Sequence, residues 1–195
     1  MLSQAGIFLV ETFFGLFALA LLLRFILQAV RAPARNPLSQ FLVSLTGFIV
    51  SPVRRVIPGL WGIDLTTLVL ALTVKWVEIA LVLVFRGFAP SLSGLAILAI
   101  LFTAAVALFK LAIYIVLVAV LIYSILSWVS PHSPAMPLFA ALARPFLLWF
   151  RRIPPIGNVD LSPLFLVVVC QLLLMLPVQW LEVTASSWLA HAFLP

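Results

Sequence analysis

Four charged residues lie within long apolar runs of this sequence, where ionisable side chains are costly and often functional. They are Glu11, Lys75, Glu78 and Lys110. A lysine at the centre of a membrane span costs about 2.5–3.5 kcal/mol on an insertion scale, so such residues normally face other helices and have partners. If the four side chains converge, they can form a site that conducts or senses a cation or a proton.

The spacing of these charges also permits a purely structural interpretation. Lys75 and Glu78 are three residues apart, so they share one face of a helix and can form an ion pair. An internal repeat, described below, places Glu11 in register with Lys110, which allows both halves of the chain to contribute to one cluster. We favour the structural interpretation, in which ion pairs join the helices or the lysines extend to the membrane surface.

Two arginine pairs, Arg54-Arg55 and Arg151-Arg152, occupy equivalent places in the two halves of the chain. Basic residues just outside apolar runs orient a membrane protein, because arginine-rich loops stay in the cytoplasm. Each such residue near an anionic leaflet also contributes about 1 kcal/mol of attraction. The pairs therefore either set the orientation alone or also bind anionic lipid or a protein partner.

An aspartate follows each arginine pair and precedes an apolar run. These residues are Asp64 and Asp160. An aspartate at a helix N-cap accepts a hydrogen bond from a free backbone amide and stabilises the helix by about 1 kcal/mol. Each aspartate can also pair with an arginine of its own or the other half and so lock the loop, and the two roles are compatible.

Residues for catalysis or metal binding are sparse. Cys170 is the single cysteine and lies in an apolar run, which excludes an intrachain disulfide and a thiolate metal site. His132 and His191 fall outside the expected spans, which argues against haem ligation within the bilayer. No nucleophile lies near a base in the expected topology. We therefore expect no enzyme activity, no metal and no cofactor.

The composition is that of an integral membrane protein. Hydrophobic residues make up 66% of the 195 residues and charged residues only 8%, which is too little polar surface for a soluble domain. The net charge of +6 comes from arginines beside apolar runs, so it indicates membrane orientation and anionic lipid rather than direct contact with nucleic acid.

The apolar runs predict four transmembrane helices. A helix of about 20 residues crosses a hydrocarbon core of about 30 Å, and every run is at least that long. Four spans place both arginine pairs on one side, in the cytoplasm, whereas splitting the third run at Lys110 would place them on opposite sides. The predicted spans cover residues of about 6–30, 64–85, 94–129 and 161–180.

Each cytoplasmic segment also contains an amphipathic stretch, at about 38–50 and about 138–150. Apolar residues recur there at helical spacing, which predicts helices that lie in the headgroup plane with an arginine pair at the carboxyl end. The chain thus consists of two copies of one unit, 1–90 and 91–195. We predict an all-α membrane protein with four transmembrane helices, arranged as two parallel helix-hairpin repeats with one cytoplasmic interfacial amphipathic helix each.

The repeated motifs closely resemble those of the YggT family of bacterial membrane proteins, and the match extends over nearly the whole chain. The first copy departs from the usual Pro-Pro, with Pro58-Gly59 and one extra residue before Asp64, which affects only the loop. The motifs that carry the resemblance are Asn36–Phe41, Arg54–Pro58 and Asp64-Leu65, then Leu126–Pro131, Arg151–Gly157 and Asp160–Pro163.

The resemblance implies a multi-pass protein of the bacterial inner membrane, with both repeat loops cytoplasmic and no catalytic site. Family members are associated with osmotic-stress tolerance, potassium homeostasis, cell division and envelope organisation, and plastid relatives with haem attachment and nucleoid distribution. We expect a scaffold or assembly factor whose partners are anionic lipids, membrane or cell-division proteins, or a second copy of this chain. The alternative is a component of ion transport or of potassium or proton homeostasis that uses the intramembrane charges.

Overall fold

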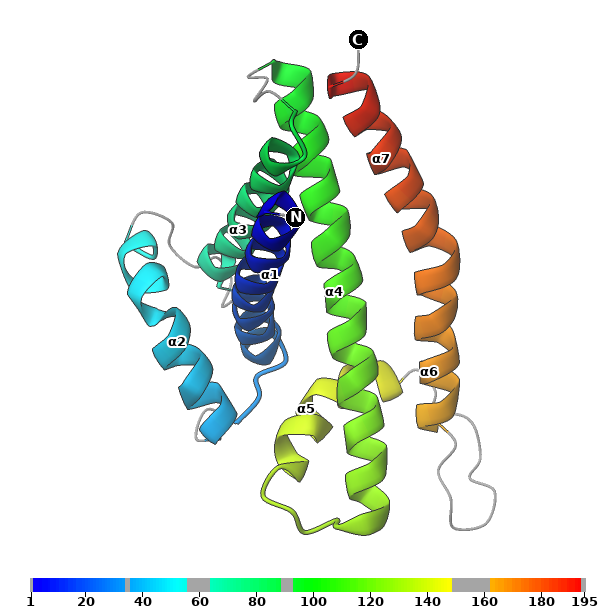
Figure 1. Ribbon diagram of the computed structural model, residues 1–195. Helices are drawn as coiled ribbons and strands as arrows, with labels where there is room; N and C mark the ends of the chain where they lie inside the picture. The colour runs from blue at the N-terminus through cyan, green and yellow to red at the C-terminus, as the bar shows by residue number, and fades with distance from the viewer. Residues whose placement is uncertain (1, 34–35, 56–63, 89–92, 149–161, 194–195) are drawn as a thin grey trace.

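The computed structural model describes residues 2–33, 36–55, 64–88, 93–148 and 162–193. Within these ranges the protein consists of helices joined by short turns, without a β-strand (Figure 1). The helices are α1 (Leu2–Ala29), α2 (Pro37–Val53), α3 (Leu65–Phe85), α4 (Gly94–Val129), α5 (Met136–Leu147), α6 (Ser162–Leu173), the π-helical turn η1 (Leu174–Val178) and α7 (Gln179–Phe193).

Four helical segments are long and apolar enough to cross a membrane, which confirms the predicted number of spans. Three of them are α1, α3 and α4, and the fourth is the continuous stretch from α6 through η1 to α7. The third apolar run forms one unbroken helix of 36 residues. At 1.5 Å per residue α4 is about 54 Å long, so it extends well beyond a hydrocarbon core of about 30 Å.

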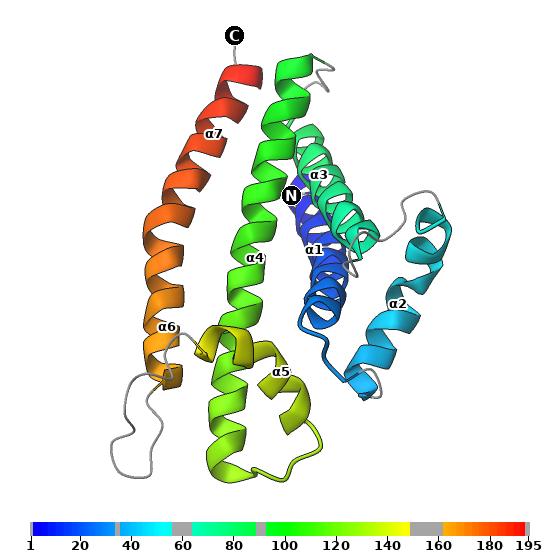
Figure 2. The ribbon, with the colours of Figure 1, turned by 180° about the vertical axis from the view of Figure 1, so that it is seen from behind.

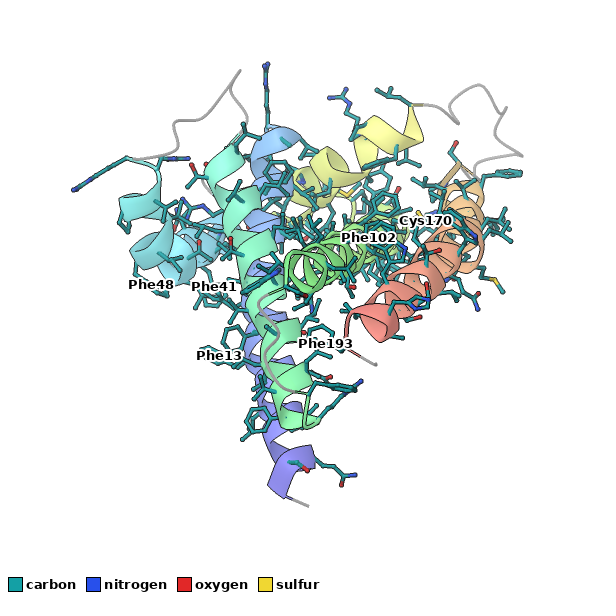
Figure 3. The ribbon with its side chains drawn as sticks, turned by 90° about the horizontal axis from the view of Figure 1, so that it is seen from above. Phe13, Phe41, Phe48, Phe102, Cys170 and Phe193 are labelled. Atoms are coloured by element: carbon teal, nitrogen blue, oxygen red, sulfur yellow. The ribbon has the colours of Figure 1, made fainter. Side chains whose placement is uncertain are left out.

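Helix α4 lies at the centre of the bundle. It contacts α1 and α3 on one side and α6, η1 and α7 on the other, and α5 packs against it as well (Figures 1 and 2). Seen from above, α1 and α3 run together at a large tilt to α4 (Figure 3). Among the described residues α3 makes no contact with α6 or α7, so α4 joins the two halves of the molecule.

The order of a long, a short and a long helix occurs twice along the chain, as the repeat predicts. The end of the bundle at which α1 and α4 finish is called the loop side below. In Figure 1 this side is at the bottom, where α5 and the beginning of α2 lie, while both chain ends lie in the upper half. The rotation axis that would relate the two halves stays a prediction.

The core consists of three apolar clusters. One joins α1 and α3 to α4, and a second joins α4 to α5, α6 and η1. The third cluster contains Ala20 and Leu27 of α1, Leu42 of α2, Ala119 of α4 and Leu138 of α5, so it connects the two halves. Small side chains such as alanine allow membrane helices to approach closely, which suits this position.

The two short helices each bury one stripe of side chains. Helix α2 buries Leu42, Thr46 and Val50, which are four residues apart, and it exposes phenylalanines on the opposite face. Its start is fixed by Asn36, whose side-chain oxygen accepts a hydrogen bond of 2.9 Å from the amide of Leu38. The predicted helices at about 38–50 and 138–150 thus correspond to α2 and α5, and their placement in the headgroup plane stays a prediction.

The fourth span is longer than the sequence indicates. Its predicted end at about Trp180 is too early, because the helix continues to Phe193. Proline lacks the amide hydrogen that a regular helix needs, and a π-helical turn is one way for a helix to continue past it. Here Pro177 lies within the turn η1, and the chain resumes as α7 immediately afterwards.

Candidate functional site

A buried arginine connects α1 to α2 near the loop side. Arg24 is only 7% exposed, and its Nη1 donates a hydrogen bond of 2.7 Å to the hydroxyl of Thr46. Thr46 is fully buried and donates in turn to the carbonyl of Leu42 at 2.6 Å. A buried charge is stable only where hydrogen bonds and opposite charges replace its water, so this contact ties α2 to the first span.

An ion pair connects α2 to α3 a short distance away. Arg54 follows the last residue of α2, and its Nη2 lies 2.6 Å from Oδ2 of Asp64. The same oxygen accepts a hydrogen bond of 2.7 Å from the hydroxyl of Thr67 in α3. Asp64 occupies the N-cap of α3, but its carboxylate makes no capping bond to a backbone amide. The carboxylate therefore joins the start of α3 to the end of α2 instead of capping α3.

These two links form one polar network, which we define as Arg24, Thr46, Arg54, Asp64 and Thr67. The guanidinium of Arg24 is attracted by Asp64 and repelled by Arg54. The charges of the two links therefore interact with each other. Two arginines and one aspartate give the network a net charge of +1. It joins α1, α2 and α3, so every helix of the first half takes part.

The charges within the apolar helices lie in separate pairs, as the structural interpretation expects. Lys75 Nζ lies 2.6 Å from Glu78 Oε1, and both side chains are largely buried. Lys110 Nζ lies 2.7 Å from Oε1 of Glu182 in α7, and these two side chains are 35% and 41% exposed. Glu11 is exposed on α1. In the described ranges no ion pair or hydrogen bond connects Glu11 to either pair or the two pairs to each other.

Several sequence predictions fall on residues outside the described ranges. These are Arg151, Arg152 and Asp160, so the second loop lock stays a prediction. Arg55 is described and is exposed just after α2.

The described ranges contain no group of three or more metal-ligating side chains. Cys170 is buried in α6, as expected for a packing residue. His132 is exposed in the turn before α5. His191 lies in the last turn of α7, and its place outside the membrane stays a prediction.

The sequence analysis missed three important partners, Thr46, Thr67 and Glu182. Glu182 was missed because the fourth span was expected to end at Trp180. A signal for Thr46 exists in the repeat itself. The equivalent position 97 residues later is Ala143, and it is equally buried but apolar. Where one copy of a repeat buries a polar residue and the other an alanine, a partner for the polar residue is expected.

Four helices that are long and apolar enough to cross a membrane indicate a multi-pass α-helical membrane protein. The family model described as CCB3/YggT matches residues 3–85 and 102–181, one segment in each half of the chain. The chain belongs to this family, which confirms the resemblance seen in the motifs.

Similar proteins occur in several bacteria. An uncharacterized protein of Pseudomonas aeruginosa is 39% identical over 181 residues, which cover 91% of this chain and 90% of that protein. A Vibrio alginolyticus protein is 38% identical, with coverage of 84% and 88%. The uncharacterized protein YggT of Escherichia coli K12 is 32% identical over 184 residues, with coverage of 93% and 94%. No solved structure matches the chain.

Proposed function

We propose that this protein is a non-enzymatic scaffold or assembly factor of the bacterial inner membrane. It would act in envelope organisation, cell division or osmotic-stress tolerance. The observation that carries the proposal is that Lys75 and Lys110 each pair with a different carboxylate. Charges neutralised in separate pairs do not line a common path, whereas an ion pathway needs charges that converge on a hydrated cavity.

Helix α2 and the two arginines after it offer a surface for partners. Arg54 is half exposed despite its ion pair, and Arg55 is exposed beside it. Helix α2 also presents Phe41 and Phe48, which are 59% and 71% exposed. Basic residues next to exposed aromatic side chains suit an anionic membrane surface or a membrane-protein partner.

One observation favours the alternative role in ion transport. The second carboxylate oxygen of Glu78 is buried and has no hydrogen-bond partner among the described residues. A buried carboxylate oxygen without a donor can accept a proton or a cation. If this oxygen serves transport, Lys75 and Glu78 form its centre, with Lys110 and Glu11 at its periphery.

The two functions are separated by flux into liposomes that contain the purified protein. We expect no potassium or proton flux above that of empty liposomes. Flux that is abolished by both Lys75→Ala and Lys110→Ala would refute the scaffold and establish transport.

The scaffold is tested independently with a photo-crosslinking residue at Phe48 on α2. We expect a discrete protein adduct in the bacterial membrane. The matched control places the same crosslinker at Val183 of α7, which is similarly exposed and distant from the basic surface. Equal and diffuse labelling from both positions would speak against a partner on α2.

A further inference from the structure

A small cavity lies beside Arg24, between the last turns of α1 and the first turns of α2. Its volume is about 120 Å³, which is large enough for several water molecules or one tetrahedral oxyanion. Its polar lining comes from Arg24, Gln28 and Ser39, while Leu27 and Leu42 are among the apolar lining residues. The cavity thus combines a buried cation with neutral polar side chains.

The guanidinium of Arg24 is incompletely hydrogen-bonded. Its Nη1 donates to Thr46, whereas its Nε is buried without a partner among the described residues. Nε and the neighbouring Nη form the edge of a guanidinium that binds a phosphate through two parallel hydrogen bonds. Gln28, one helical turn further along α1, shares this face and lines the same cavity.

The local charge favours an anion. Asp64 is the carboxylate that interacts electrostatically with Arg24, and its Oδ2 is already bound by Arg54 and Thr67. The polar network therefore keeps a net charge of +1. Among the described residues no ion pair joins Arg24 to Asp64, so the buried guanidinium can still bind an anion directly.

The position of the cavity suits a headgroup. Arg24 lies five residues before the end of α1, which is about 7.5 Å along the helix axis. This depth is close to the boundary between the hydrocarbon core and the headgroup region on the loop side.

We propose that this cavity is a phosphate-binding site, in which Arg24 binds the phosphate and Ser39 donates a further hydrogen bond. The phosphate belongs either to a phospholipid of the adjacent leaflet or to free inorganic phosphate. The bound anion compensates the buried charge of Arg24 and tightens the contact between α1 and α2. The site does not depend on the proposed scaffold function.

The test is thermal unfolding of the purified protein in detergent, followed by tryptophan fluorescence. Added phosphatidylglycerol is compared with dioleoylglycerol, which has similar chains but no phosphate. Inorganic phosphate is compared with chloride at equal ionic strength. A ligand at a hundred times its Kd should raise the Tm by roughly 5–10 °C for a chain of this size.

Two variants locate the site. Arg24→Gln should abolish the rise in Tm, whereas Arg144→Gln, which changes an exposed arginine of α5, should retain it. Ser39→Leu should also abolish the rise, because it fills the cavity while leaving the bond between Arg24 and Thr46 in place. Its matched control is Ser44→Leu, which changes an exposed position of α2.

The outcomes distinguish the sources and can overturn the site. A rise with phosphatidylglycerol alone identifies a phospholipid, and an equal rise with inorganic phosphate identifies a free anion. An equal rise with dioleoylglycerol, no rise with any ligand, or a full response of Ser39→Leu would each overturn the proposal. The Tm response of Ser39→Leu tests the site even if Arg24→Gln fails to fold.

Discussion

The hydroxyl of Thr46 is the hydrogen-bond acceptor for a guanidinium that is 93% buried, which makes Thr46→Val an informative substitution. Valine has nearly the same shape as threonine, so the change removes the hydroxyl without opening a cavity. Arg24 would keep its charge and its burial but lose the acceptor of its Nη1. We therefore expect Thr46→Val to weaken the contact between α1 and α2.

The magnitude follows from the charge and the burial. A hydrogen bond to a charged group contributes about 1.5–3 kcal/mol in soluble proteins. Hydrogen bonds between membrane helices average only about 0.6 kcal/mol and reach about 1.7 kcal/mol. Since this bond is both buried and charged, we expect a loss of about 1.5–2 kcal/mol. For a chain of this size that corresponds to a Tm lower by roughly 3–8 °C.

A matched control is available on α3. The hydroxyl of Thr73 donates to the carbonyl of Val69 at 2.9 Å, just as Thr46 donates to Leu42, but Thr73 is exposed and bonds to no arginine. Thr73→Val should change the stability by less than about 0.5 kcal/mol. The assay is reversible unfolding of both variants in mixed detergent micelles.

The reasoning is refuted if the two valine variants lose the same stability within 0.5 kcal/mol, a margin about the size of an ordinary surface effect. A double-mutant cycle sharpens the test. In an Arg24→Met background, Thr46→Val should become nearly neutral, because the guanidinium that needs the hydroxyl is gone. A full effect in that background would assign the loss to packing rather than to the hydrogen bond.

Three further predictions concern the ion pairs. Arg54→Gln should destabilise the protein by about 1–3 kcal/mol in the same unfolding assay, because it leaves the carboxylate of Asp64, which is 4% exposed, without its arginine. An unchanged stability would contradict a structural role for this ion pair. Lys75→Met should destabilise the protein more than the double variant Lys75→Met/Glu78→Leu, because the single change leaves a buried carboxylate unpaired. A greater loss of stability in the double variant would refute the ion pair. A zero-length carbodiimide crosslinker should join Lys110 to Glu182, which mass spectrometry of peptides detects, and absence of this crosslink would argue against the long fourth helix.

The number of spans followed from the sequence because apolar runs of sufficient length have few alternatives in a membrane. Helix ends were harder to predict. Proline usually marks a boundary, but η1 accommodates Pro177 within a continuous helix, and whether this happens depends on neighbouring helices rather than on local sequence. The error at this boundary also concealed the partner of Lys110.

The candidate site was only partly predictable for a related reason. The pairing of Lys75 with Glu78 and that of Arg54 with Asp64 follow from proximity along the chain. The contact of Arg24 with Thr46 spans 22 residues and depends on how α2 folds back against α1, which no local pattern specifies. A comparison of the two copies of the repeat would have indicated that Thr46 needs a hydrogen-bond partner, but it would not have identified Arg24 as that partner.

The polar network has a consequence for biosynthesis. All of its members lie between positions 24 and 67, so every one of its bonds can form before α4 is synthesised. The equivalent of Thr46 in the second half, Ala143, is apolar. The first three helices can thus form these contacts while the ribosome is still translating. The remaining helices would then assemble on that finished surface by apolar packing.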